Sequence, residues 1–420
     1  NRTVSWRKYT GKYFFDRGIH SSYTFKHADT DRYFDRLFLR GRKGTHLIMY
    51  DFLVVGAGFF GAVFAHEVKK AGKKVLVIEK RDHIGGNCYT CDDPETHINV
   101  HQYGPHIFHA PNKTIWDYVN TFTEFNDYRH RVLTTARGKV YSLPINLATI
   151  NQFYHLNLTP AEATEFLKSK TGKISLPKNL EEKAISLVGQ ELYEAFIKGY
   201  STKQWGCDPK ELPAEIITRL PVRTSDDDSY YNDDYQGMPV GGYTPIFEKL
   251  LKDIPVELRT DFFDKREYWK SRAGIVVYTG PIDRYFDYRY GKLSWRSCRF
   301  EKENKTADDH QGISIMNYAD LEIPYTRVIE YKHFYPEKIH LSRGTTLIRE
   351  YPYDNPDEPY YPVGMKTDRG KMMHYQEMLR SEKAVIFGGR LAEYKYYDMD
   401  EVISGALQQV KKITRAGSGT

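Results

Sequence analysis

Three glycines mark the part of the sequence with the clearest chemical meaning. Gly56, Gly58 and Gly61 follow the apolar run 52–55 in GxGxxG spacing. In such a turn the first glycine allows the tight bend, the second lets the backbone approach a pyrophosphate, and the third lets helix and strand pack closely. A second apolar run ends in Glu79, 18 residues beyond Gly61, where an acid can bind a ribose hydroxyl. The pattern predicts a dinucleotide site with its phosphates at a helix N-terminus.

The glycine spacing alone fits NAD as well as FAD. The doublet Gly85-Gly86, followed by Asn87, favours FAD, because many flavoproteins carry such a doublet shortly after the acid and nicotinamide domains usually lack it. The alternative is a doubly wound protein that uses its glycines only for packing.

A related arrangement occurs near the C-terminus. The apolar run 384–387 ends in Gly388-Gly389-Arg390, and a helix is expected after Asp398-Met399-Asp400. These turns could bring further backbone amides to the nucleotide, with Arg390 opposing its negative charge. We therefore predict an α/β fold in which both chain ends build a Rossmann-like FAD-binding domain, with an inserted helical domain and an antiparallel β-sheet layer.

The expected domain order follows from these insertions. We expect residues 1–48 to be an extension that is not native to the protein, because Met49 stands directly before the first strand; a basic interaction arm is the alternative. The remaining units are the FAD-binding domain (49–128, 236–290 and 381–415), a helical substrate domain (129–220) with a mobile loop to about 235, and an antiparallel sheet domain (291–380). Strands are expected at 256–263 and 274–279, and several short alternating ones within 293–350, such as 293–300 and 326–331.

Composition excludes some classes of function. Residues 1–48 carry a net charge of +7 within a total of +6, so residues 49–420 are close to neutral and offer no basic surface for nucleic acid. Cys88 and Cys91 form a lone CxxC, which we interpret as reduced thiols rather than a metal or redox site. The apolar stretch 52–65 is shorter than the about 20 residues that a membrane span needs. We expect a cytoplasmic protein without membrane insertion.

Several aromatic and polar residues are candidates for a site. His106 and His109 follow a Gly-Pro turn, and 34 tyrosines suggest a cleft lined by phenols. Phe196 and Tyr200 are spaced i, i+4 on a predicted helix, which is typical either of core packing or of a clamp that stacks on a base.

At this point the chain resembles a known family. The segments GAGFFGA, YGPHIFH, KQWG, RLPVR, EPYYPV and GGRLAEYKYYDMD, over 49 to about 412, are similar to those of bacterial UDP-galactopyranose mutases. The resemblance implies an isomerase that interconverts UDP-galactopyranose and UDP-galactofuranose, through a covalent adduct of the sugar anomeric carbon with N5 of reduced FAD. It also implies a homodimer, and a product used for lipopolysaccharide or capsule.

The resemblance also implies roles for individual residues. Arg219, Arg327, His106 and Asp398 would be catalytic, the two arginines binding the phosphates. Substrate would contact Phe196, Tyr200, Ser201, Trp205, Tyr230, Tyr361, Tyr396 and His109. The cofactor would contact Gly56, Gly58, Phe60, Gly61, Glu79, Lys80, Gly86, Asn87, His106, Ile107, Phe262, Gly389, Arg390, Asp398 and Met399. No metal ligand is expected.

Two other functions stay open on the sequence. An FAD-dependent amine oxidase or desaturase would share the cofactor domain but would not need phosphate-binding arginines. A flavin-binding protein without catalysis would bind FAD but no UDP-sugar. Among UDP-sugars, the resemblance implies that His109 favours plain UDP-galactose, because relatives that accept the N-acetylated sugar are expected to carry a different residue there.

Overall fold

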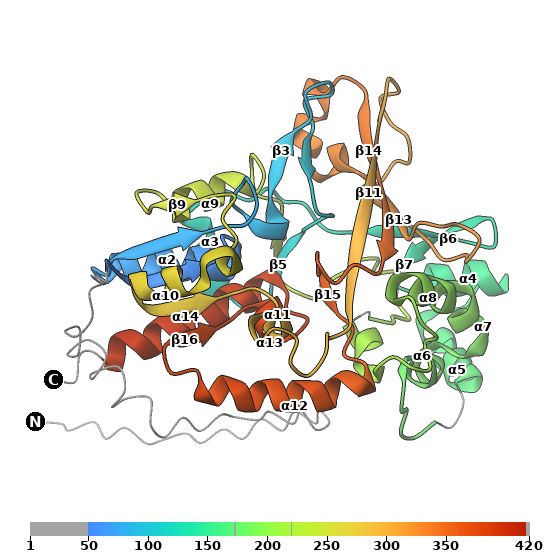
Figure 1. Ribbon diagram of the computed structural model, residues 1–420. Helices are drawn as coiled ribbons and strands as arrows, with labels where there is room; N and C mark the ends of the chain where they lie inside the picture. The colour runs from blue at the N-terminus through green and yellow to red at the C-terminus, as the bar shows by residue number, and fades with distance from the viewer. Residues whose placement is uncertain (1–48, 172–173, 220, 417–420) are drawn as a thin grey trace, which may run out of the picture.

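A computed structural model of the chain describes residues 49–171, 174–219 and 221–416. The predicted N-terminal extension, 1–48, lies outside the described residues. Two sheets organise the fold, a parallel one and a larger, mostly antiparallel one (Figure 1).

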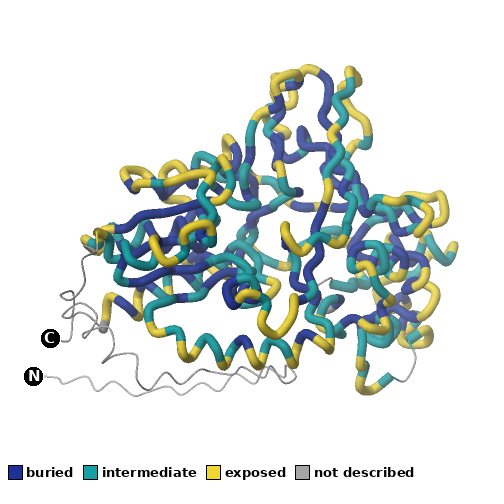
Figure 2. The backbone as a smooth tube through the Cα atoms, in the orientation of Figure 1, coloured by how far each residue is buried: buried dark blue, intermediate teal, exposed yellow. Residues whose placement is uncertain are grey.

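The parallel sheet contains strands from both ends of the chain, as predicted. Its order is β16-β10-β1-β2-β9, and each neighbouring pair is parallel. The strands are β1 (Tyr50–Val55), β2 (Val75–Ile78), β9 (Val256–Glu257), β10 (Ala273–Tyr278) and β16 (Val385–Phe387). The central strands β1, β2 and β10 are mostly buried (Figure 2), which is typical of a parallel sheet covered on both faces, whereas the edge strand β9 is not.

Side chains of successive residues enter different cores on the two faces of this sheet. Phe52 and Val54 join the core that includes helices α2 (Phe59–Lys70) and α14 (Met399–Ala416), whereas Leu53 joins a second core. The second core includes residues of α10 (Arg266–Arg272), α11 (Ile282–Tyr285) and α12 (Lys366–Ser381). The alternation explains why the run 52–55 is apolar at every position.

The second sheet has the order β15-β11-β14-β13-β12-β6-β7 and is antiparallel except between β12 and β6. Its longest strands stand upright at the centre of Figure 1. The strands are β6 (Val132–Ala136), β7 (Lys139–Leu143), β11 (Trp295–Lys305), β12 (Ile315–Tyr318), β13 (Arg327–Glu330), β14 (Thr345–Tyr353) and β15 (Tyr361–Pro362).

Helices between β7 and β8 form the inserted layer, drawn in green on the right of Figure 1. They are α4 (Leu147–Tyr154), α5 (Pro160–Lys170), α6 (Leu180–Val188), α7 (Gln190–Leu192), the π-helical η2 (Tyr193–Lys198), α8 (Gly199–Trp205) and η3 (Ala214–Arg219). Helix α5 begins with a capping box between Thr159 and Glu162 and has Pro160 in its first turn.

Shorter elements complete the chain. They are η1 (Gly86–Cys88), β3 (Thr90–Asp92), β4 (Asn99–His101), β5 (Phe108–Ala110), α3 (Lys113–Asn120), β8 (Tyr235–Gly237), α9 (Thr244–Leu250), η4 (Phe262–Lys265), η5 (Tyr331–Phe334), η6 (Pro336–Leu341) and α13 (Arg390–Glu393). Within the described ranges, no helix combines the length and the apolarity that crossing a membrane requires.

Two sequence expectations differ from the structure. The segment predicted as helical from residue 129 begins with the hairpin β6–β7, because Arg137 and Gly138 both adopt positive φ (52° and 73°), as a tight two-residue hairpin turn requires. The strand expected at 256–263 ends at Glu257. Within the rest of the predicted strand, the side chain of Asp261 accepts a hydrogen bond from the Phe263 amide at 3.0 Å and caps the start of the 3-10 helix η4.

Candidate functional site

The glycine turn after β1 leaves the start of helix α2 open to a ligand. A Cβ on Gly61 would lie 2.0 Å from the Gly56 carbonyl oxygen, so helix and turn pack too closely for any side chain. At Gly58, the N-cap of α2, an added Cβ would meet only the Gly86 Cα, at 3.8 Å. Because a glycine cap has no side chain, the first amides of α2 keep their capacity to bind a phosphate.

A cavity of about 240 Å³ borders this turn. Its lining comes from both ends of the chain and from the middle, so the topology of the parallel sheet creates it. The predicted cofactor residues in its lining are Gly56, Gly58, Phe60, Gly61, Glu79, Lys80, Gly86, Asn87, His106, Phe262, Gly389, Arg390 and Met399. Ile107 and Asp398 are not part of this lining, although the residues next to them in the chain, His106 and Met399, are.

The acid at the end of β2 is fixed by backbone amides. One oxygen of Glu79 accepts from the Ala57 amide at 2.8 Å, and the other accepts from the Arg81 amide at 3.0 Å. Several cations lie near this acid. Burial is the main cause that lowers the pKa of Lys80, and the charges of Arg81 and Arg284 lower it further. A surplus of positive charge at a cavity wall suits a phosphorylated ligand.

Aromatic rings connect this cavity to the inserted helices. The Arg390 guanidinium lies 4.8 Å from the ring centroid of Tyr396 and 5.6 Å from that of Tyr361. Tyr361 and Tyr396 stack with centroids 5.4 Å apart, and Trp205 meets Tyr361 edge-on at 6.5 Å. Four predicted site residues therefore lie together, and the fourth, Trp205, brings the end of helix α8 to this group.

Arg327 is held in place by a buried carboxylate. Its Nη2 atom lies 2.9 Å from Oε2 of Glu350, which is fully buried and directly opposite on the neighbouring strand. Burial acts to lower the pKa of Arg327, but the charge of Glu350 outweighs it and raises this pKa. Tyr200 and Tyr361 add smaller effects in the same direction. The Nε atom of Arg327 is buried and has no hydrogen-bond partner among the described residues. Both carboxylate oxygens of Glu350 are likewise buried without a hydrogen-bond partner among the described residues, so the two side chains meet as an ion pair. The Arg327 side chain is 21% exposed, and its outer face is a candidate binding point for an anion.

Three phenol groups are within range of this arginine's charge. Burial is the main cause that raises the pKa of Tyr200, Tyr231 and Tyr361, and the charge of Arg327 opposes the increase in each case. The influence of Arg327 on all three places them near its guanidinium. At neutral pH these tyrosines keep their protons and can donate hydrogen bonds.

The two predicted histidines have different surroundings. The amide of His106 donates to Nδ1 of His101 at 3.0 Å, and Nδ1 of His106 lies 2.7 Å from the Gly104 carbonyl oxygen. Burial lowers the pKa of His106 to about 4, so the ring is neutral at pH 7. His109 instead stacks on Tyr231 at 3.8 Å and lies 2.5 Å from an oxygen of Asp233.

Other predicted residues are placed less directly. Phe196 is 4% exposed and packs edge-on against Tyr141 and Phe153, with centroids 4.9 and 5.4 Å away. It lies in the π-helical turn η2, whereas Tyr200 lies in α8. Ser201 is buried in the same helix. The backbone of Arg219 ends η3, but its side chain lies outside the described part of the chain.

Sequence reasoning missed four residues at this site: Glu350, Tyr231, Asp233 and Asp400. Asp400 is 7% exposed, and burial raises its pKa to about 6. Its signal was available, because it stands in the same Asp-Met-Asp segment as Asp398. Glu350 carries no local signal, because its role depends on the pairing of two strands.

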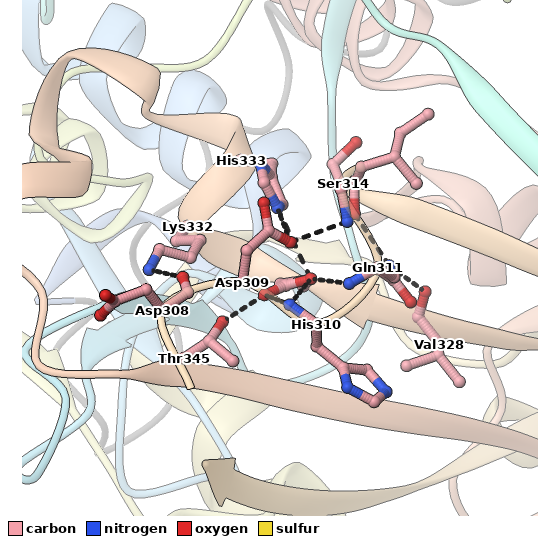
Figure 3. Close-up of polar contacts among 12 residues, drawn as sticks. Asp308, Asp309, His310, Gln311, Ser314, Val328, Lys332, His333 and Thr345 are labelled. Carbon is pink, nitrogen blue, oxygen red and sulfur yellow. Dashed lines mark hydrogen bonds and ion pairs between the residues drawn. The ribbon is translucent and has the colours of Figure 1, made fainter. Parts of the chain in front are cut away.

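A second polar cluster lies in the antiparallel sheet (Figure 3). Side-chain ligand atoms of Asp309, Glu330 and His333 all lie within 4.8 Å of one another. Hydrogen bonds already satisfy Glu330: its oxygens accept from the amides of His310 and Gln311 at 3.1 and 2.9 Å and from the Thr345 hydroxyl at 2.6 Å. We interpret this cluster as a network that fixes the β11–β12 connection.

The parallel sheet, the glycine turn and the adjoining cavity define a protein of the Rossmann-like nucleotide-binding class. A family model described as an NAD(P)-binding Rossmann-like domain matches residues 54–122, and one described as UDP-galactopyranose mutase matches 195–396. The chain belongs to the UDP-galactopyranose mutase family, whose members are isomerases.

Similar proteins support this membership over most of the chain. A Klebsiella pneumoniae protein named "Probable UDP-galactopyranose mutase" is 44% identical over 85% of this chain and 92% of its own length. An Escherichia coli protein named dTDP-fucopyranose mutase is 42% identical over 85% and 96%. The crystal structure of a reduced UDP-galactopyranose mutase superimposes with a TM-score of 0.69 over 88% of this chain and 94% of that one, at 14% identity, which shows a shared fold.

Proposed function

We propose that this enzyme interconverts UDP-galactopyranose and UDP-galactofuranose and requires FAD in its reduced form. The observation that carries the proposal is Arg327, whose guanidinium is fixed by Glu350 and keeps a buried, unpartnered Nε atom. An amine oxidase or desaturase has no need for such an anion-binding point. The names of the relatives support the same substrate.

The cavity fits a flavin dinucleotide. Its glycine turn, the open start of α2 and the cations beside Glu79 would hold the diphosphate and ribose, while Asn87, His106 and Met399 would border the rest of the cofactor. When bound and reduced, FAD supplies through N5 the nucleophile that attacks the anomeric carbon of the sugar.

The protein's own tasks are binding, orientation and exclusion of water. Arg327, together with Arg219, would bind the two phosphates, since a guanidinium fork meets phosphate oxygens bidentately. Tyr230, Tyr361 and Tyr396 would donate hydrogen bonds to the diphosphate. Tyr396 is 40% exposed, so its phenol is open to an incoming ligand.

Further residues would position the sugar and the base. Trp205 would border the sugar, and Tyr200, with Phe196 and Ser201, would bind uracil. His109 would face the sugar, and His106, neutral at pH 7, would act near the cofactor as a hydrogen-bonding group rather than as a cation. Asp398 would influence the charge of the same region.

A dTDP-linked 6-deoxy sugar is the second candidate substrate, because a 42% identical relative is named for it. The test is to incubate the FAD-bound, dithionite-reduced protein with UDP-galactofuranose or dTDP-fucofuranose and to follow the pyranose product by chromatography. We expect conversion of the UDP-sugar, and none without reductant. Absence of conversion with fully reduced FAD would overturn the proposal, and preferential turnover of the dTDP-sugar would change the substrate.

Three further properties are part of the proposal, and two of them, the homodimer and the use of the product, rest on the resemblance alone. We propose a cytoplasmic homodimer whose product enters lipopolysaccharide or capsule. Sedimentation of the purified protein tests the dimer, and loss of galactofuranose from surface glycan after gene disruption tests the use of the product.

A further inference from the structure

A lysine on helix α8 is surrounded by backbone carbonyls from another part of the chain. Nζ of Lys203 donates hydrogen bonds to four carbonyl oxygens, those of Tyr318 and Asp320 at 2.8 Å and those of Ile323 and Tyr325 at 3.0 Å. All four belong to the segment 318–325, which runs from the last residue of β12 through the turn that leads to β13. An ammonium group has three N–H donors, so the fourth carbonyl is held by charge and by shared hydrogen bonds.

Rings of backbone carbonyls at such distances are typical sites for monovalent cations, because they replace the cation's hydration shell. Converging carbonyl oxygens repel one another when no cation lies between them. The turn therefore depends on the ammonium for its shape. Lys203 fills a cation site that the chain builds for its own side chain.

The same helix touches this turn at a second point and is held at its end. A Cβ on Gly199 would lie 2.2 Å from the Ala319 carbonyl oxygen, so the backbones of helix and turn are in contact. On the opposite side, Arg296 of β11 donates from Nη2 to the Lys203 carbonyl at 3.0 Å and from Nε to that of Gln204 at 2.9 Å. Helix α8 is thus fixed to the antiparallel sheet from two directions.

The elements joined by Lys203 carry the proposed substrate contacts. Tyr200 and Trp205 lie on α8, and Arg327 begins the strand that follows the turn. We propose that Lys203 is a positioning residue: its ammonium occupies a cation-binding turn and sets helix α8 relative to Arg327. The consequence for turnover rests on the proposed function, whereas the cation site itself does not.

The first experiment compares Lys203→Ala with Lys198→Ala, which removes an exposed lysine one turn earlier. We expect Lys203→Ala to lower the thermal midpoint and to reduce kcat/KM for the UDP-sugar by about tenfold or more, with FAD still bound. Propylammonium carries the atoms that this substitution removes and should restore both. Tetramethylammonium at equal ionic strength has the charge but no N–H donor and should restore neither.

Equal effects of the two ammonium ions, or parent-like behaviour of Lys203→Ala, would overturn the inference. If the parent shows no mutase activity, the proposed function fails, yet rescue of the thermal midpoint still tests the cation site. If Lys203→Ala does not fold, the site is tested on the native parent instead. Its lysines are acylated, and mass spectrometry compares the rates at which Lys203 and Lys198 react. Burial lowers the pKa of Lys203 to about 8, which by itself would make its amine more reactive than that of an exposed lysine. The four carbonyls instead hold the group as an ammonium, so at pH 7 Lys203 should react at least about tenfold more slowly than Lys198, and an equal or faster rate would refute the site.

Discussion

Replacing Asp400 by asparagine should stabilise the protein at neutral pH. The side chain is 7% exposed in the first turn of α14, and burial, reinforced by the charges of Asp398 and Glu401, raises its pKa to about 6. Backbone hydrogen bonding and His109 oppose this shift. The folded protein therefore holds an ionised carboxylate at pH 7 in a place that disfavours the charge.

The magnitude follows from linkage. A carboxyl with a pKa of about 6 when folded and 3.8 when unfolded costs up to about 3 kcal/mol of folding free energy when it is ionised. The folded state binds the proton more tightly, so this cost is absent below about pH 4, grows as the pH rises, and is complete above about pH 6. Because asparagine has no charge, Asp400→Asn should gain about 1–3 kcal/mol at pH 8 and almost nothing at pH 4.

Urea unfolding at pH 4, 5, 6 and 8, followed by tryptophan fluorescence, measures this difference. The control Glu401→Gln removes an exposed carboxylate from the same turn but keeps an acceptor for the Asp398 amide. Its effect on the midpoint should not follow the same pH profile. If Asp400→Asn gains the same free energy of unfolding at pH 4 and pH 8, or is less stable than the parent at pH 8, burial does not control the ionisation of Asp400.

Three further predictions follow from the two sites. Gly61→Ala places a Cβ 2.0 Å from the Gly56 carbonyl oxygen and should abolish retention of FAD, measured by absorbance after gel filtration. Arg219→Ala and Arg327→Ala should each lower kcat/KM by about a hundredfold or more while FAD stays bound, and near-full activity of either would refute its phosphate contact. Glu330 is buried, and although burial opposes the shift, hydrogen bonds lower its pKa to about 2. Glu330→Gln should therefore cost up to about 3 kcal/mol of stability above pH 4.5. In urea titrations this cost should shrink as the pH falls toward 2.

The nucleotide-binding half of the fold could be predicted because its signals are local. The glycines, the apolar runs and Glu79 lie within one continuous βαβ segment, and each requires its residue type for a reason that does not depend on distant parts of the chain. The hairpin β6–β7 also had a local signal, the Arg137-Gly138 turn, but the surrounding segment was interpreted as helical.

The rest of the site depends on contacts that no short motif encodes. Glu350 faces Arg327 only because β13 and β14 pair in one register. The spacing of Phe196 and Tyr200 predicted a shared helical face, but the π-helical turn η2 lies between the preceding helix and α8, and Phe196 packs into the core of the inserted helices. Its contact with a base therefore stays a prediction.

The groups around Arg327 carry little charge of their own, which bears on the proposed binding of a diphosphate there. Burial lowers the pKa of His106 to about 4 and that of His130 to about 3, and the nearby tyrosines stay protonated, so at pH 7 these groups add no charge of their own. The guanidinium of Arg327 is already oriented by Glu350. An incoming phosphate then meets a donor whose conformational entropy has been lost in folding rather than in binding. On this proposal, affinity would come from preorganisation, which would depend in turn on the register of β13 and on the ammonium held by the turn before it.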